Sequence, residues 1–225
     1  MEYARLSLCE EEVMGVIWDS VSESEFSYIL DTANGRYGTD WKISTVSTYL
    51  NRIMKKGFLE QEKRGRNTLY RFRISANDYY KARMREYFQL FYKKDADHFL
   101  SDLASAKALD FHKNELPALS LAEEKLFSIV LRGDGVLKLS DIIRCYNIYS
   151  GATEPTVRTL LSRLAKKGYV VCYKRHGSFC YKAVVEKDAY IKERLYDTYH
   201  FFSRIETFSA DKLLPDDLLT DEVAC

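Results

Sequence analysis

Residues 45–58 read Thr45-Val46-Ser47-Thr48-Tyr49-Leu50-Asn51-Arg52-Ile53-Met54-Lys55-Lys56-Gly57-Phe58, and the chain repeats this stretch 111 positions later as Thr156-Val157-Arg158-Thr159-Leu160-Leu161-Ser162-Arg163-Leu164-Ala165-Lys166-Lys167-Gly168-Tyr169. Thr, Val, Thr, Leu, Arg, Lys, Lys and Gly recur at matching places, and the other apolar positions stay apolar. A chain of 225 residues can form one large domain or two ordinary ones. The repetition favours two copies of one module.

The repeated stretch has the pattern of an amphipathic helix. Three apolar residues fall at i, i+4 and i+7 in each copy, Val46, Leu50 and Ile53 in the first and Val157, Leu161 and Leu164 in the second. The opposite face carries hydroxyl, amide and cationic donors one turn apart, which suits a helix in the major groove of DNA. An ordinary surface helix is the alternative, since polar faces at helical spacing are common. The face consists of Thr45, Ser47, Thr48, Asn51, Arg52 and Lys55, and in the second copy of Thr156, Arg158, Thr159, Ser162, Arg163 and Lys166.

The net charge of +1 conceals an uneven division along the chain. Residues 41–73 hold nine Lys or Arg and two acids, and residues 156–187 hold eight and one, so each stretch carries +7. The remainder must then carry −13. Because each basic stretch contains the repeated helix and the residues after it, the sorting favours phosphate binding over a uniformly solvated surface.

Composition and motifs argue against several other classes of protein. No apolar run approaches the roughly 20 residues that span a bilayer, and the start has no signal-peptide pattern, so we expect a soluble protein of the cytosol without a membrane partner. No triad order, glycine-rich phosphate loop or paired-carboxylate site stands out, so we do not expect an enzyme. The four histidines are scattered, and the cysteines form no close pair, which favours reduced thiols over a redox or metal sensor and predicts no metal site and no cofactor. The cysteines are Cys9, Cys145, Cys172, Cys180 and Cys225.

Two capping boxes predict equivalent helix starts, Ser7-Leu8-Cys9-Glu10 and Ser120-Leu121-Ala122-Glu123. A second helix is expected over residues 23–33 and 139–149, followed by the turn signals Asn34-Gly35 and Ser150-Gly151. The helices that follow the capping boxes each carry one apolar face, formed by Val13, Met14, Ile17 and Trp18 and by Leu126, Phe127, Val130 and Leu131.

The repeated helix comes third in each copy. Thr39 or Asp40 is expected to cap its start in the first copy, and Thr153 in the second, where Pro155 is tolerated in the first turn. Gly57 and Gly168 are expected to end it as left-handed caps.

After these glycines the pattern becomes that of a hairpin. Residues 58–63 and 68–73 are expected to form strands around the turn Arg64-Gly65-Arg66-Asn67, and residues 169–174 and 179–185 around Arg175-His176-Gly177-Ser178. Three helices followed by a hairpin with a basic tip are the order of a winged helix-turn-helix. The tip residues would lie along the phosphate backbone; solvated turn residues are the alternative.

Helical sequence dense in aromatic residues follows each hairpin, over residues 76–92 and 95–106, and over 187–202 and 204–213. Left exposed, these residues would make a large apolar patch, so we expect them to be buried against the matching helices of the other repeat. They are Tyr79, Tyr80, Tyr87, Phe88, Phe91 and Tyr92, and Tyr190, Tyr196, Tyr199, Phe201 and Phe202.

Several of these motifs together resemble the BlaI/MecI penicillinase-repressor family: Leu-Ser-x-x-Glu near the start, Val-Met-x-x-Ile-Trp, Thr-Val-x-Thr-Tyr-Leu-Asn-Arg-Ile-x-x-Lys-Gly-Phe-Leu and Lys-Arg-Gly-Arg-x-x-x-Tyr. The resemblance covers residues 6–107 well and residues 119–213 more weakly. It implies a winged-helix repressor that dimerises through the helices after the wing and places its third helix in an operator half-site.

The resemblance also implies roles for individual residues. The groove-facing residues would be Thr45, Ser47, Thr48, Asn51 and Arg52 with their counterparts in the second copy. Contacts with the DNA backbone would fall to Lys55, Lys56, Arg64 and Arg66 in the first copy, and to Lys166, Lys167, Arg175 and His176 in the second.

The chain departs from the family in carrying two such units where usual members carry one. We therefore expect an α+β protein, mainly α with small β-hairpins, in which two tandem winged helix-turn-helix domains form an intramolecular pseudo-dimer through their dimerisation-type helices. The expected layout is a first winged-helix domain (1–75), its dimerisation-type helices (76–107), a linker (108–118), a second winged-helix domain (119–186), its dimerisation-type helices (187–215) and an acidic tail (216–225).

The expected partner is a double-stranded DNA operator. Because the repeated helices differ, Thr-Val-Ser-Thr-Tyr-Leu-Asn against Thr-Val-Arg-Thr-Leu-Leu-Ser, the operator should be an imperfect palindrome, with half-sites roughly 34–36 Å apart. A sensor or inducer stays unidentified: the copper-binding cysteine cluster of some relatives is absent, and no local sequence establishes the proteolytic trigger of others. The alternative function is a winged-helix scaffold that binds proteins, and in a mixed case only the first repeat reads bases.

Overall fold

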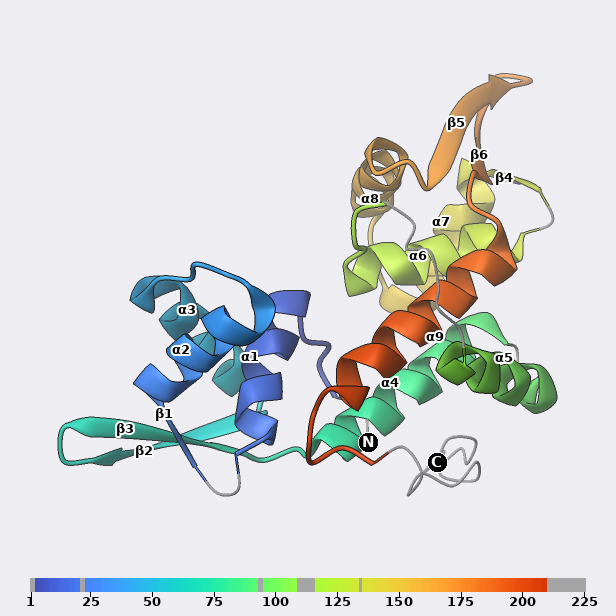
Figure 1. The fold of residues 1–225 in the computed structure, drawn as a ribbon. Coiled ribbons are helices and arrows are strands. Elements are labelled where there is room, and N and C mark those ends of the chain that lie inside the picture. The colour runs from blue at the N-terminus through green and yellow to red at the C-terminus, as the bar shows by residue number, and fades with distance from the viewer. Residues whose placement is uncertain (1–2, 21–22, 93–94, 109–115, 134, 210–225) are drawn as a thin grey trace. The chain divides into compact units, whose positions relative to one another are not determined.

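The computed structural model describes residues 3–20, 23–92, 95–108, 116–133 and 135–209. In the first repeat the elements are α1 (Leu8–Trp18), β1 (Ser24–Glu25), α2 (Phe26–Tyr37), α3 (Ile43–Lys55), β2 (Leu59–Arg64), β3 (Asn67–Phe72), α4 (Ala76–Phe91) and α5 (Ala96–Ala108). In the second they are α6 (Leu121–Arg132), β4 (Val136–Lys138), α7 (Leu139–Ser150), α8 (Glu154–Lys166), β5 (Val170–Arg175), β6 (Ser178–Ala183) and α9 (Lys187–Ser203). Figure 1 shows both sets of helices and hairpins. The predicted α+β class is confirmed.

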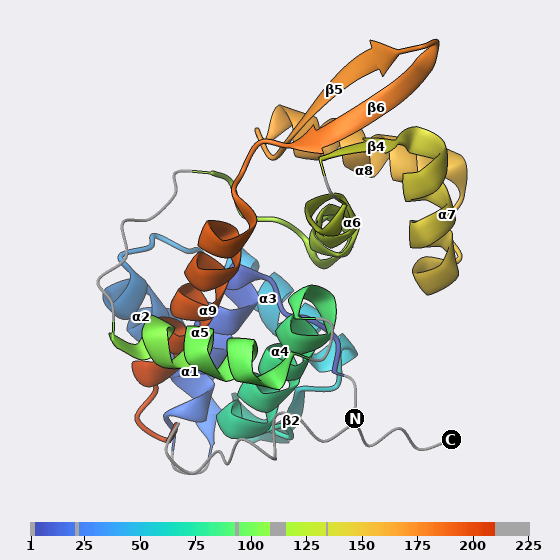
Figure 2. The same cartoon turned by 90° about the vertical axis from the view of Figure 1, so that its right-hand side faces the viewer.

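Each repeat folds as three helices and a three-stranded antiparallel sheet. The strand orders are β1-β3-β2 and β4-β6-β5, so each hairpin gains a short edge strand from the segment before the second helix. These edge strands were not predicted: residues 23–25 were expected to be helical, whereas Ser24 pairs with Tyr70 and Glu25 with Leu69. In the second repeat the hairpin β5–β6 extends past α6, α7 and α8 (Figure 2).

The apolar stripes form the core of each winged helix, as predicted. Val46, Leu50 and Ile53 of α3 are fully buried, and so are Val157, Leu161 and Leu164 of α8. The predicted apolar faces of α1 and α6 are buried as well, and both predicted capping boxes are present. This packing fixes α3 and α8 by one face and leaves the other face at the surface.

Each of the helices α3 and α8 is followed by a glycine in the left-handed conformation. Gly57 and Gly168 have φ of 81° and 84°, and the next backbone N–H groups, of Phe58 and Tyr169, donate to the carbonyls of Ile53 and Leu164. This is a Schellman ending, which turns the chain from the helix into the first strand of the hairpin. The prediction for both glycines is confirmed.

Other boundaries differ from those predicted. Asn34 and Gly35 lie inside α2, which continues to Tyr37 and ends at the left-handed Gly38. The residue before α3 is Lys42, with neither Thr39 nor Asp40 at the cap position. In the second repeat Thr153 occupies the cap position, but its side chain makes no capping hydrogen bond.

The segments after the wings match the prediction except at the end of the chain. The helices α4, α5 and α9 lie within about two residues of their expected bounds. Residues 204–209 form turns and irregular backbone where a helix was expected. The rest of that predicted helix, most of the linker and the acidic tail lie outside the described residues.

Contacts divide the chain into two units that do not coincide with the repeats: residues 1–86 with 198–225, and residues 87–197. In the first unit the ring of Phe202 on α9 lies 5.4 Å from that of Tyr80 on α4, and 5.7 Å from that of Trp18 on α1. The Thr207 hydroxyl donates to the Trp18 carbonyl (2.8 Å). In the second unit the ring of Phe91 on α4 lies 5.9 Å from that of Tyr190 on α9. Each unit therefore buries aromatic side chains contributed by both repeats.

A buried tyrosine joins the first helix of each repeat to the helix after its wing. The Tyr79 hydroxyl donates to Glu11 Oε1 (2.9 Å), and the Tyr190 hydroxyl donates to Glu124 Oε1 (3.0 Å). Burial raises the pKa of both phenols, so each hydroxyl stays a proton donor. The helix after the wing is thus bonded to the domain that carries the hairpin. Within the described ranges, no helix is both long and apolar enough to cross a membrane.

Candidate nucleic-acid interface

The loop between α2 and α3 sets the position of α3. Asn34, in the last turn of α2, accepts from the backbone N–H of Trp41 (2.8 Å) and from the Thr39 hydroxyl (2.8 Å). Its amide also donates to the Trp41 carbonyl (3.1 Å). One side chain thereby braces the tight connection that a helix-turn-helix requires. This explains why Asn34-Gly35 belongs to the helix and not to the turn.

The polar face of α3 lies at the surface. Thr48, Asn51, Arg52 and Lys55 are exposed, while Thr45 is half-buried, as is Ser47 of the same predicted set. The Thr48 hydroxyl donates to the Ser44 carbonyl (2.8 Å), so its oxygen and methyl group are left to contact a ligand. Amide, guanidinium and ammonium donors follow one another along this face. Such groups can bind base edges and phosphates.

The polar face of α8 is wholly exposed. All six predicted residues, Thr156, Arg158, Thr159, Ser162, Arg163 and Lys166, lie at the surface. The Thr159 hydroxyl donates to the Pro155 carbonyl (2.9 Å), as Thr48 does to Ser44 in the first copy. Arg158 forms an ion pair with Glu154 one turn earlier (2.7 Å) and lies over the Phe179 ring. The helices α3 and α8 thus share a pattern of contacts but present different side chains.

Lys56 and Lys167 form ion pairs within the fold, beside the DNA contacts predicted for them. The Lys56 ammonium lies 2.6 Å from the buried carboxylate of Glu10 and donates to the Arg5 carbonyl (2.8 Å). Lys167 lies 2.7 Å from Glu123 and donates to the Ala118 carbonyl (2.7 Å). In this structure the two lysines hold the ends of α3 and α8 to the capping boxes of α1 and α6, while their contacts with the DNA backbone stay a prediction.

These lysines keep the capping carboxylates ionised. Burial raises the pKa of Glu10, but hydrogen bonds from Lys56 and Ser7 outweigh it, and the net shift is downward. The pKa of Glu123 is lowered for the same reasons, with Lys167 and Ser120 as donors. The same buried ion pair therefore occurs in both repeats.

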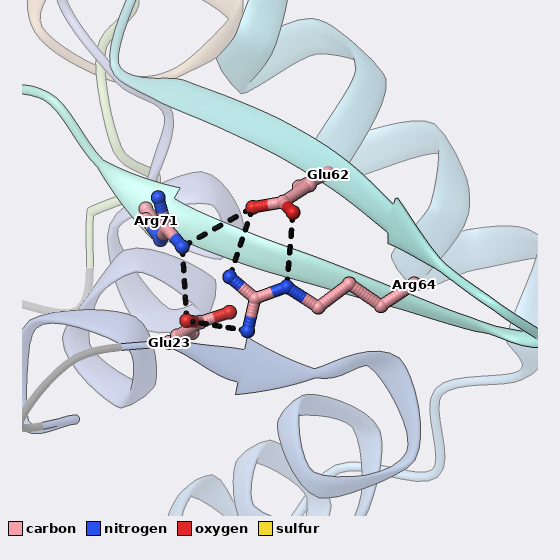
Figure 3. Close-up of polar contacts among 4 residues, drawn as sticks. All are labelled: Glu23, Glu62, Arg64 and Arg71. Carbon is pink, nitrogen blue, oxygen red and sulfur yellow. Dashed lines mark hydrogen bonds and ion pairs between the residues drawn. The ribbon is translucent and has the colours of Figure 1, made fainter.

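The first hairpin ends in a tight two-residue turn. Arg64 pairs with Asn67 around Gly65 and Arg66, and only Gly65 has a positive φ (63°), as in a type II′ turn. Arg66 is exposed at the tip, where a phosphate could reach it. Arg64 is engaged: its side chain forms ion pairs with Glu62 (2.9 Å) and Glu23 (3.1 Å), as Figure 3 shows.

The second hairpin has a different turn and a different surface. Arg175 pairs with Ser178 around His176 and Gly177, both with positive φ (48° and 77°), as in a type I′ turn. Arg175 and His176 are exposed. The Lys174 ammonium lies 5.1 Å above the Phe179 ring, a cation–π contact at the tip.

Residues outside the predicted set also belong to these surfaces. Lys138, Lys174 and Lys182 are exposed on the second sheet, and the carboxylates of Glu23 and Glu62 lie on the first. Glu62, Lys174 and Lys182 fall within the strands that the sequence predicted, but Glu23 and Lys138 lie at edge strands too short to predict. Among the described residues, no group of three or more His, Cys, Asp or Glu could hold a metal ion.

Comparison with known proteins finds relatives of one family. A model of the penicillinase repressor family matches the chain twice, over residues 6–122 and 119–214. The chain is similar to a penicillinase repressor of Bacillus licheniformis, at 32% identity over 39% of this chain and 66% of that protein. It is also similar to an uncharacterized 16.5 kDa protein from the ptsI 3' region of Latilactobacillus sakei, at 35% identity over 29% of this chain and 42% of that protein. The matches thus span between two fifths and two thirds of these relatives' lengths.

Among solved structures, the chain is similar to the solution structure of the DNA binding domain of the repressor BlaI. It shares 32% sequence identity, covers 33% of this chain and 89% of that chain, and has a TM-score of 0.30. The double match of the family model confirms the tandem repeat. Members of the penicillinase repressor family are transcriptional regulators and not enzymes.

Proposed function

Because the chain belongs to the penicillinase repressor family, we propose that it is a transcriptional repressor that binds double-stranded DNA by sequence. The observation that carries this proposal is the pair of recognition helices, α3 and α8. Each is fixed by a buried apolar stripe and exposes a face of donors. The helix α3 lies within the first stretch of charge +7, and α8 lies within the second from Thr156 onward. The positive charge around both helices attracts a polyanion such as DNA.

The proposed mechanism divides the exposed residues by chemistry. On α3, Asn51 can pair with adenine and Arg52 with guanine through their bidentate geometries, while Thr48 offers a methyl group to thymine. Lys55 and Arg66, as flexible or terminal cations, suit phosphates. On α8, Thr159, Ser162 and Arg163 are the counterparts of Thr48, Asn51 and Arg52, and Arg158 adds a guanidinium for the groove.

We propose further that the operator is an imperfect palindrome bound by one chain. Asn51 in the first helix is replaced by Ser162 in the second, and Ser47 by Arg158, so the two half-sites should differ in sequence. The contacts of α4 with α9 within each unit, Tyr80 with Phe202 and Phe91 with Tyr190, support an internal pseudo-dimer. In that arrangement, contacts between the helices after the two wings replace, within one chain, the contacts that join two chains in a dimer.

Selection of binding sites tests this proposal directly. The full-length chain would be incubated with a pool of random duplexes, and the bound fraction would be amplified and sequenced. We expect enrichment of two related but unequal half-sites about one helical turn apart, with affinity that falls steeply as salt rises. Absence of enrichment together with salt-insensitive or undetectable duplex binding would overturn the proposal and favour a protein-binding scaffold.

A further inference from the structure

The two hairpin sheets can be compared position by position because their strands pair in the same order and register. Alternate residues along a strand, and residues directly opposite on neighbouring strands, share a face. Arg64 and Arg175 occupy equivalent positions, so we call the two faces that carry them the Arg64 face and the Arg175 face. The Arg64 face consists of Glu23, Glu25, Glu60, Glu62, Arg64, Asn67, Leu69 and Arg71, and the Arg175 face of Val136, Lys138, Val171, Tyr173, Arg175, Ser178, Cys180 and Lys182.

On the Arg64 face, both arginines form ion pairs with carboxylates. Glu62 accepts from Arg64 (2.9 Å) and from Arg71 (3.2 Å). Glu23, just before β1, lies 3.1 Å from Arg64 and 2.9 Å from Arg71, so the four side chains form a closed ring of ion pairs (Figure 3). The hydrogen bond from Arg64 lowers the pKa of Glu62 and keeps it charged. A phosphate that approached Arg64 would compete with these carboxylates for its N–H donors and be repelled by their charge.

The Arg175 face has lost every one of those carboxylates. Register places Val136 and Lys138 where the first sheet has Glu23 and Glu25. Val171 and Tyr173 stand where it has Glu60 and Glu62. The two cationic positions are kept, as Arg175 and Lys182 in place of Arg64 and Arg71, and both are exposed. The face therefore carries three cations, Lys138 included, and no acid.

We propose that the Arg175 face is the principal phosphate-binding surface among the two wings, and that the carboxylates of the Arg64 face keep the first wing from contributing comparably. Lys138, Arg175 and Lys182 would contact the DNA backbone, and Tyr173 would pack against the sugars between them. The first repeat then binds DNA mainly through α3, while the second also binds the DNA backbone strongly and without dependence on sequence. This inference rests on the proposed function, since it assigns the wings their parts in binding a duplex.

A matched pair of substitutions tests the inference. Arg64→Gln and Arg175→Gln would be compared by fluorescence anisotropy on a labelled random-sequence duplex about four helical turns long, across a series of salt concentrations. Loss of one phosphate contact lowers the salt slope by about 0.9 and weakens binding severalfold. We expect that loss for Arg175→Gln and less than about a third of it for Arg64→Gln. Equal losses, or a larger loss for Arg64→Gln, would overturn the inference.

The converse substitutions provide a gain of function. Glu23→Gln with Glu62→Gln should free Arg64 and Arg71 and steepen the salt slope, whereas Val171→Glu with Tyr173→Glu should flatten it. Circular dichroism melting of each variant would verify that the fold is kept. A failure of Glu23→Gln with Glu62→Gln to steepen the slope in a folded protein would contradict the carboxylate argument. If the unmodified chain binds no duplex, the proposed function fails as well; if it binds and the matched variants lose equally, only the wing inference fails.

Discussion

Two neighbouring lysines at the end of α3 have different surroundings, although the sequence gives them the same appearance. Lys55 is exposed on the polar face, whereas Lys56 turns back to the buried carboxylate of Glu10. The same division separates Lys166 from Lys167, which binds Glu123. Because a buried carboxylate left without its partner is costly, Lys56 is expected to matter for stability and Lys55 for DNA binding.

Substitution of the two lysines by alanine separates these roles. Lys56→Ala should lower the free energy of unfolding by about 1–3 kcal/mol, because it strands the Glu10 carboxylate. Lys55→Ala should change it by less than about 0.5 kcal/mol, while weakening binding to all duplexes alike. Urea unfolding and anisotropy titrations measure the two effects. If Lys56→Ala left stability unchanged, the structural role assigned to Lys56 would be wrong.

The Glu10 and Glu123 ion pairs also predict a dependence of stability on pH. Their pKa values are lowered in the folded state, below the ordinary value of 4.5, so the unfolded chain binds protons more readily. The stabilisation is therefore complete above pH 4.5 and is lost as the pH falls through the lowered pKa values. Urea unfolding from neutral pH down to about pH 3 should show a smaller acid loss for Glu10→Gln with Glu123→Gln than for the unmodified chain. Equal losses would contradict this assignment.

At the scale of elements, the recognition helices and the wings could be predicted because local signals agree there. An apolar stripe, a polar face and a glycine at the end define α3 and α8, and a basic turn with a glycine between two short runs defines each hairpin. The edge strands β1 and β4 were missed because two or three residues carry no periodicity. The extension of α2 was missed because Asn34 reads as a turn residue until Thr39 and Trp41 are seen bound to its side chain.

The surroundings of the site were harder to predict than its elements. Lys56 meets Glu10 across 46 residues of sequence, and Arg71 meets Glu23 across 48, so no local pattern reveals either pair. In both pairs a carboxylate neutralises a cation. A count of charges along the sequence would treat both cations as available to bind DNA. The charge of +7 counted for residues 41–73 and for residues 156–187 hides this difference between the two wings.

The two recognition helices are expected to read different half-sites. Asn51→Ala should reduce discrimination by about 1–3 kcal/mol at a base pair of one half-site only. Ser162→Ala, at the equivalent position of α8, should relax preference at the other half-site. Repeating the site selection with each variant measures this directly. A uniform loss over both half-sites, or no change in preference for either variant, would count against base reading by these residues.

At the scale of the whole molecule, the central feature is the duplication. Each packing unit draws on both repeats, since Thr198 to Ser209 group with the first winged helix, and Tyr87 to Ala108 with the second. A chain built in this way has no need of a second copy to present two recognition helices. The proposed pseudo-dimer therefore predicts that dimerisation and DNA binding are independent of each other.

The number of chains on one operator tests this account most directly. Analytical ultracentrifugation of the 26.2 kDa chain with a duplex that contains both selected half-sites gives the mass of the complex. The account predicts one chain per duplex, and a marked loss of affinity when either half-site is scrambled. Two chains per duplex, each occupying one half-site, would contradict it.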